Sequence, residues 1–266
     1  MVKSKHARPP ENISGLQISY FTPELPPPYS YQYVLDVQFG AEDLLVDFKL
    51  EYTGREDLEE EDILAEGFSI DDDFSYKGNL PFIWREALLK QLAKTTYFKE
   101  IPVDYPVHVK IESEAGQESF EGFPADLKNW EYFLQELNQG IFEAGKRERQ
   151  LEVLYKKIDN KHEESGLTLK VSFLSRSAII IREESNKVIG EETIPWKELK
   201  HILKAIYMPD YITEKAIGNL PTKVGKYINP GDGLWYEFGK ALKNPDANFN
   251  SLKKLEDILH EDKRPD

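Results

Sequence analysis

Residues 78–92 read GNLPFIWREALLKQL, and residues 190–203 read GEETIPWKELKHIL. In both segments a Pro stands shortly before a Trp, and Leu residues follow the Trp at helical spacing. Proline is favoured in the first turn of a helix, and apolar residues at this spacing form one buried stripe. Both segments therefore predict an amphipathic helix that opens with a Trp on its buried face.

The other two tryptophans stand in a similar setting. Trp130 follows Pro124 and Trp235 follows Pro230, each by a few residues, and apolar residues again follow at helical spacing. We therefore expect four Trp-anchored helices. Their expected ranges are about 81–93, 125–144, 196–208 and 234–243.

Runs of alternating apolar and polar residues predict strands ahead of these helices. The clearest are residues 31–39 and 44–52, and the short link between them is typical of a hairpin. Runs of short strands closed by helices favour an α+β fold of antiparallel sheets, each covered by Trp-anchored amphipathic helices. The remaining strands are expected at 16–22, 63–70, 107–112, 119–123, 151–158, 167–174, 178–183 and 187–192.

Two blocks of the chain share the order of four strands, Pro, Trp and helix. This order suggests an internal duplication of a four-strand-plus-helix unit, in which Trp84 and Trp196 are equivalent. Sequence identity between the blocks is low, so independent origin of the two blocks explains the pattern as well. Beyond Pro209 we expect a helical C-terminal segment of short pieces. These are residues 211–217, 221–227, 234–243 and 251–260.

Four regions follow from these patterns. Residues 1–11 are expected to be disordered, and residues 12–148 to form an acidic α+β lobe. Residues 149–208 are expected to form a second α+β unit packed on the first, followed by the helical segment 209–266.

The chain of 266 residues contains no Cys, which excludes disulfides, thiolate catalysis and Cys-ligated zinc. No run approaches the roughly 18–20 apolar residues of a membrane span, and the basic first residues lack the apolar core of a secretory signal. We therefore expect a soluble, cytoplasmic protein without membrane contact. The sequence leaves its oligomeric state open.

The net charge of −14 is unevenly distributed. Residues 1–150 contain 29 Asp and Glu against 15 Lys and Arg, whereas residues 151–266 contain 19 of each kind. An acidic lobe repels nucleic-acid phosphates and attracts basic proteins. The charge therefore favours a basic protein partner and argues against nucleic acid. Solubility alone is the alternative explanation.

No known catalytic or cofactor motif occurs in the sequence: it lacks a P-loop, a GxGxxG, a GxSxG and an HExxH. The five histidines are scattered along the chain, and we expect structural or solvated roles for them. The sequence thus predicts no catalytic residue, no metal-ligand set and no cofactor. These histidines are His6, His108, His162, His201 and His260.

Acidic residues gather in two stretches that lie close together in the sequence. The spacing within them is not that of a calcium-binding EF-hand loop, and dense like charges favour a solvated loop. If the protein docks a basic surface, these residues are the expected contact. The candidates are Glu56, Asp57, Glu59, Glu60, Glu61, Asp62, Asp71, Asp72 and Asp73.

The sequence also contains Pro-Pro-Pro-Tyr at residues 26–29, which matches the PPxY pattern read by aromatic-grooved modules. Four residues are a weak signal, and a rigid connection between the first two strands is the favoured interpretation, because consecutive prolines restrict the chain.

These observations favour a non-enzymatic, acidic interaction protein, such as an inhibitor, an immunity-type partner or a scaffold. Two alternatives remain open. A nucleic-acid-binding regulator built from repeated strand–helix units would need stacking aromatics on its sheets, with Tyr31, Tyr33, Phe39 and Phe48 as candidates. A metal-dependent enzyme would use clustered carboxylates such as Asp71 or Asp73.

Overall fold

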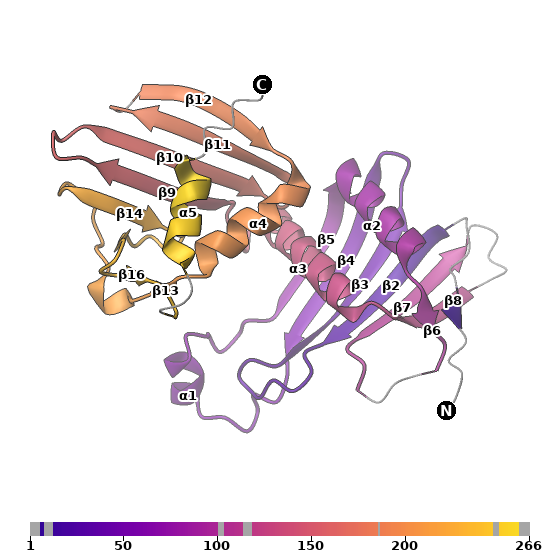
Figure 1. Cartoon of the computed structure of the whole chain (residues 1–266). Coiled ribbons are helices and arrows are strands. Elements are labelled where there is room, and N and C mark those ends of the chain that lie inside the picture. The colour runs from indigo at the N-terminus through magenta and orange to yellow at the C-terminus, as the bar shows by residue number, and fades with distance from the viewer. Residues whose placement is uncertain are drawn as a thin grey trace. The chain divides into compact units, whose positions relative to one another are not determined.

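The computed structural model describes residues 6–7, 13–100, 104–113, 119–185, 187–246 and 250–260. Within it the chain divides into two compact units, Met1–Glu148 (unit 1) and Arg149–Asp266 (unit 2). Both units consist of antiparallel sheets with helices (Figure 1). The α+β class predicted from the sequence is confirmed.

Unit 1 is built on an eight-stranded antiparallel sheet with the strand order β1-β6-β8-β7-β2-β3-β4-β5. Its helices are α1 (Glu60–Ala65), α2 (Phe82–Lys94) and α3 (Leu127–Ala144). The strands are β1 (His6–Ala7), β2 (Ile13–Phe21), β3 (Tyr31–Phe39), β4 (Asp43–Tyr52), β5 (Phe74–Pro81), β6 (Tyr97–Phe98), β7 (Val107–Ser113) and β8 (Ser119–Pro124).

The core of unit 1 lies between one face of this sheet and the helices α2 and α3. Alternate strand residues such as Leu35 and Phe48 are fully buried on that face, because successive side chains of a strand point to opposite sides. Trp84 on α2 and Trp130 on α3 are fully buried as well. The expectation that these two tryptophans anchor helices is confirmed.

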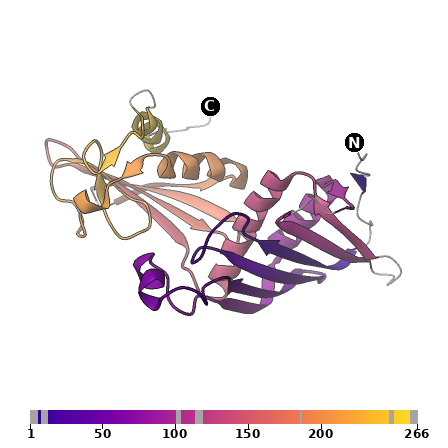
Figure 2. The same cartoon turned by 90° about the horizontal axis from the view of Figure 1, so that it is seen from below.

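Unit 2 contains a six-stranded antiparallel sheet with the order β12-β11-β10-β9-β14-β15. Figure 2 shows α4 (Trp196–Tyr207) and α5 (Ser251–His260) on the same side of this sheet. Further elements are β13 (Asp210–Tyr211) paired with β16 (Leu242–Lys243), and the 3-10 turn η1 (Thr213–Lys215). The sheet strands are β9 (Leu151–Ile158), β10 (Glu164–Ser172), β11 (Ser177–Glu184), β12 (Lys187–Ile194), β14 (Gly225–Asn229) and β15 (Tyr236–Glu237).

Both units contain four consecutive strands that are neighbours in the sheet in chain order, followed by a helix that starts after a Pro. These are β2 to β5 with α2, and β9 to β12 with α4. The two tryptophans at the helix starts differ in burial. Trp84 is fully buried, whereas Trp196 is half-buried against Phe173, with the Arg176 guanidinium 5.3 Å from its ring centroid. A common origin of the two blocks stays a prediction.

The strand expected at residues 63–70 is wrong. That region contains α1, and the fourth strand of the meander is β5. Three acidic residues, Glu60, Glu61 and Asp62, form the first turn of α1, where negative charge is favourable at a helix N-terminus.

Three of the four helices expected after Pro209 are also wrong, namely those at residues 211–217, 221–227 and 234–243. Residues 225–229 form β14, which pairs with β9, and Trp235 bridges Ile217 before β15 begins. Gly239, inside the expected helix 234–243, has a positive φ angle of 78°, which a right-handed helix cannot include.

Within the expected 211–217 helix the structure has only β13 and the short turn η1, whereas the C-terminal helix α5 is confirmed. Because β14 and β15 complete the sheet begun by β9, residues 149–266 form one compact unit. The disorder expected for residues 1–11 falls mostly outside the described residues. His6–Ala7, which are described, form β1 and pair with β6.

Candidate functional site

The connection between β4 and β5 is strongly acidic. Residues 53–73 contain ten Asp and Glu against a single basic residue, Arg55. They include α1, which lies beyond the ends of β4 and β5 (Figure 1). We call residues 53–73 the acidic protrusion, and it contains every acidic candidate predicted from the sequence.

The guanidinium of Arg55 joins the two ends of the acidic protrusion to each other and to Pro28. Its Nε and Nη2 donate to the carbonyl oxygen of Pro28 at 3.1 and 3.0 Å. Its Nη1 donates to the carbonyl oxygen of Ser69 at 3.1 Å and to Oδ2 of Asp72 at 2.9 Å. Only 10% of the Arg55 side chain is exposed. The one basic side chain of the protrusion is therefore largely buried and bonded to other groups of the protein.

Aromatic and aliphatic contacts complete the base of the protrusion. The guanidinium carbon of Arg55 lies 3.8 Å from the ring centroid of Tyr52 and 4.8 Å from that of Phe68. Cation–π contacts of this kind strengthen when the pair is shielded from water. Ile63 is buried and is the one buried side chain of α1. These contacts enclose Arg55 at the base of the protrusion, and Ile63 anchors the six-residue helix α1.

Two of the nine acidic candidates serve the internal structure. Asp72 accepts hydrogen bonds from the backbone N–H and the hydroxyl of Ser69 and pairs with Arg55. Burial alone would raise the pKa of Asp72, but the hydrogen bonds from Ser69 and Arg55 outweigh burial and hold the pKa below its usual value. Asp73 accepts from the backbone N–H of Tyr52 at 2.8 Å. Both carboxylates therefore shape the protrusion.

The other seven acidic candidates are exposed to solvent and lie on the ordered protrusion. Two large apolar side chains are exposed beside them, with 51% of Leu64 and 52% of Ile70 accessible. Charged and apolar groups thus share one surface. The seven are Glu56, Asp57, Glu59, Glu60, Glu61, Asp62 and Asp71.

The proline-rich turn at residues 26–29 packs against the acidic protrusion. The hydroxyl of Tyr29 donates to Glu66, and its ring lies edge-on to Phe68 with centroids 5.3 Å apart. The carbonyl oxygen of Pro28 is held by Arg55. These contacts favour the interpretation of this turn as a rigid connection over that of a free PPxY ligand.

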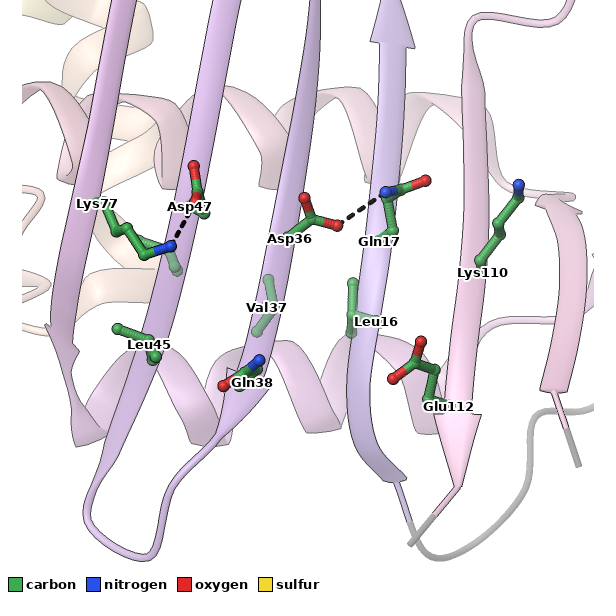
Figure 3. Close-up of a pocket in the computed structure, with 11 residues that line it drawn as sticks. Leu16, Gln17, Asp36, Val37, Gln38, Leu45, Asp47, Lys77, Lys110 and Glu112 are labelled. Carbon is green, nitrogen blue, oxygen red and sulfur yellow. Dashed lines mark hydrogen bonds and ion pairs between the residues drawn. The ribbon is translucent and has the colours of Figure 1, made fainter. Parts of the chain in front are cut away.

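A second candidate site is the face of the unit 1 sheet opposite α2 and α3. A hollow of about 380 Å³ lies there. Figure 3 shows polar side chains of neighbouring strands along it, with the helices behind. Cross-strand partners form one row over this face: Lys77 on β5, Asp47 on β4, Asp36 on β3, Gln17 on β2 and Lys110 on β7.

The charges in this row are largely satisfied by their neighbours. Asp47 and Asp36 lie opposite each other, an arrangement that is destabilising between like charges. Each has a partner on its other side: Lys77 Nζ lies 2.8 Å from Asp47 Oδ2, and Gln17 Nε2 donates to Asp36 Oδ1 at 2.8 Å. The hydrogen bond from Lys77 lowers the pKa of Asp47 below its usual value. A carboxylate held in this way is a weak base.

The alternation in the sequence placed these polar residues on one face, but their arrangement as a row depends on the register of five strands. The hollow is lined by carboxylates, amides, lysines and aliphatic side chains. Its described lining contains no Ser, Thr, His or Tyr that could act as a nucleophile beside a base.

Among the histidines whose side chains are described, none lies in a catalytic group. His108 Nε2 lies 2.8 Å from Oε1 of Glu121, and its ring stacks on Phe123 with centroids 4.8 Å apart. Burial lowers the pKa of His108, although Glu121 acts in the opposite direction. His162 and His201 are exposed to solvent. The side chains of His6 and His260 are outside the described part of the chain.

The stacking aromatics proposed for nucleic-acid binding are largely inaccessible. Tyr33 and Phe48 are buried on the helix-covered face of the sheet, and Tyr31 and Phe39 are half-buried. Among the described residues no group of three or more His, Asp or Glu is placed to hold a metal ion.

Comparisons with known proteins find no matching family model, no similar curated protein and no similar solved structure. No helix in the described ranges is both long and apolar enough to cross a membrane.

Proposed function

We propose that this chain is a non-enzymatic interaction protein, an inhibitor, immunity-type partner or scaffold, whose acidic protrusion docks a basic surface of another protein. One observation carries the proposal. The single cation of the protrusion, Arg55, is enclosed by Pro28, Ser69 and Asp72, while seven carboxylates beside it face solvent. The protrusion therefore presents negative charge from an ordered segment.

Order in the free protein favours binding. A segment that already has its bound conformation loses less conformational entropy on association than a flexible loop does. The exposed carboxylates would steer a basic partner toward the protrusion and speed its association at low salt. Leu64 and Ile70 would supply apolar area that is removed from water at the contact.

The alternatives have less support. Nucleic-acid binding would require accessible aromatics, and the aromatics suggested for it are buried or half-buried. A carboxylate metal site would require converging oxygen ligands, whereas Asp72 and Asp73 are engaged with Arg55, Ser69 and Tyr52.

The test is affinity capture from a native lysate with two variants of equal net charge. One replaces Glu59, Glu60, Glu61 and Asp62 by their amides. The matched control replaces four exposed glutamates elsewhere on unit 1 by glutamine. The control positions are Glu42, Glu51, Glu86 and Glu112.

We expect the wild type and the control to retain the same basic protein at low salt, and the protrusion variant to lose it. Raised salt should release the partner, because exposed charges are screened over a Debye length of about 8 Å at physiological ionic strength. A partner that the protrusion variant retains in full, or no partner at low salt, would contradict the proposal.

A further inference from the structure

The two large sheets have two long edge strands among the described residues. The eight-stranded sheet ends in β1 and β5, and the six-stranded sheet ends in β12 and β15. β1 and β15 contain two residues each, whereas β5 and β12 contain eight. An edge strand leaves a row of backbone N–H and C=O groups without a strand partner, so a long one can pair with another chain.

β5 carries features that discourage such pairing. Lys77 lies in its middle with the side chain largely exposed, and Pro81 at its end has no N–H to donate. The described side chains of β5 include no exposed large apolar residue other than this proline.

β12 also has a lysine and a bulge, but it differs from β5 in exposing large apolar side chains. Its Val188 and Ile189 are 62% and 58% exposed, which are high values for large apolar side chains on a strand. A bulge against β11 leaves Ile189 without a cross-strand partner, since Val188 pairs with Glu183 and Gly190 pairs with Arg182. The edge of β12 therefore presents two apolar side chains together with free backbone groups.

The charges of β12 are arranged so that the strand complements itself. Lys187 lies opposite Glu184 on β11, and Glu192 lies opposite Ile180. Glu184 and Ile180 are an even number of residues apart on one strand, so Lys187 and Glu192 share a face of the sheet. When two copies of β12 run antiparallel about a two-fold axis between Ile189 and Gly190, Lys187 of each copy meets Glu192 of the other.

We propose that β12 is a self-association edge, which pairs antiparallel with β12 of a second copy and joins their six-stranded sheets. Two Lys–Glu pairs would flank the two-fold axis, and the four exposed side chains of Val188 and Ile189 would lie near it. Such an interface is isologous, because the same surface is used by both copies.

The charge pattern selects the second copy over a foreign basic strand. A basic strand would place positive charge against Lys187 as well as against Glu192, whereas the strand's own antiparallel copy offers the opposite charge at both positions. The interface is one strand wide, so we expect weak, concentration-dependent association rather than an obligate dimer. This inference is independent of the acidic protrusion.

The test is sedimentation velocity of the full chain at low salt, at concentrations up to about 1 mM, where even a Kd of 1 mM gives substantial dimer. The variants are Lys187→Glu, Glu192→Lys and the double variant. Each single variant places like charges opposite each other twice in the dimer, so its Kd should rise by about tenfold. The double variant exchanges the two charges and should regain the wild-type Kd.

Mixing the two single variants separates pairing from misfolding. In the mixed dimer both charge pairs are again opposite in sign, so an equimolar mixture should associate more tightly than either variant alone. Ile189→Lys should abolish the dimer while leaving the far-ultraviolet circular dichroism unchanged. A wild type that is monomeric at the highest concentration, or a mixture no tighter than its components, would overturn the proposal.

Discussion

Gly140 on α3 lies directly against the indole of Trp84 on α2, where a Cβ at position 140 would stand 3.0 Å from both Nε1 and Cζ2 of the ring. Real side-chain carbons rarely approach other atoms so closely. The absence of a side chain at Gly140 therefore lets the two helices of unit 1 pack with Trp84 fully buried between them and the sheet.

We expect Gly140→Ala to destabilise the protein. Alanine would favour the helix by about 1 kcal/mol, but overpacking of a buried contact typically costs about 1–3 kcal/mol, and Trp84 has little room to move. The free energy of unfolding, measured in urea, should therefore fall by about 1 kcal/mol. The double variant Gly140→Ala with Trp84→Phe should lose less stability than the sum of the losses in the two single variants. A stabilised Gly140→Ala protein would show that the indole can shift.

Trp130 offers a test of a buried hydrogen bond. Its Nε1–H donates to Oγ1 of Thr95 at 2.8 Å, and that hydroxyl donates to the carbonyl oxygen of Gln91 at 2.7 Å. Thr95→Val would leave the indole N–H buried without its partner, at a cost of about 1–3 kcal/mol in the free energy of unfolding. Thr95→Ser keeps the hydroxyl, so its free energy of unfolding should fall much less. Equal losses in the two variants would indicate that the methyl group of Thr95 contributes as much stability as its hydrogen-bonded hydroxyl.

The ion pair between Asp72 and Arg55 should make the protein sensitive to acid. The pKa of Asp72 is lower in the folded chain than in the unfolded one. The stability that Asp72 contributes is therefore present above its unfolded pKa of about 4 and is lost as the pH falls through the folded pKa. The free energy of unfolding should exceed that of Asp72→Asn at pH 7, and the difference should shrink below about pH 4.

Asp71→Asn is the matched control for this measurement, because Asp71 is exposed beside Asp72. In urea unfolding at a series of pH values, the free energies of unfolding of the wild type and Asp71→Asn should not approach each other in the same way as the pH falls. A difference between wild type and Asp72→Asn that stays constant from pH 7 to pH 3 would contradict the role given to the ion pair.

Much of unit 1 could be predicted because its signals are local. The strand at residues 31–39 was predicted with the bounds of β3, since apolar and polar residues alternate along it with Val34 as the one exception. The helices of Trp84 and Trp130 were predicted from a preceding Pro and apolar residues at helical spacing. In each case the deciding residues are neighbours in the sequence.

Unit 2 shows where local signals fail. The apolar residues after Trp235 fit a helical spacing, yet Tyr236 pairs with Ile228 and Tyr227 pairs with Lys156 on β9. Lys156 is 71 residues away from Tyr227, and the sheet that this long-range pairing builds outweighs a local helical preference. Gly239 within the predicted helix was the available signal against it, because glycine is a poor helix former.

The acidic protrusion also combines a feature that local sequence predicted with features that depend on long-range contacts. The density of carboxylates in the sequence predicted that most of them would be exposed. It could not show that Asp72 and Asp73 are engaged, because their partners include Arg55 and the backbone of Tyr52 across a fold of the chain. Nor could it show that the row from Lys77 to Lys110 crosses five strands, since that depends on register.

The position of β2 in its sheet has a consequence for the synthesis of the protein. β2 lies between β3 and β7, and Gly15 pairs with Glu112. A nascent chain that has emerged from the ribosome only as far as α2 can form the meander β2 to β5, but one side of β2 has no neighbour until β7 follows. During that interval the growing chain exposes a long strand edge that contains Leu16 and Ile18, and it is then prone to aggregation and to chaperone binding.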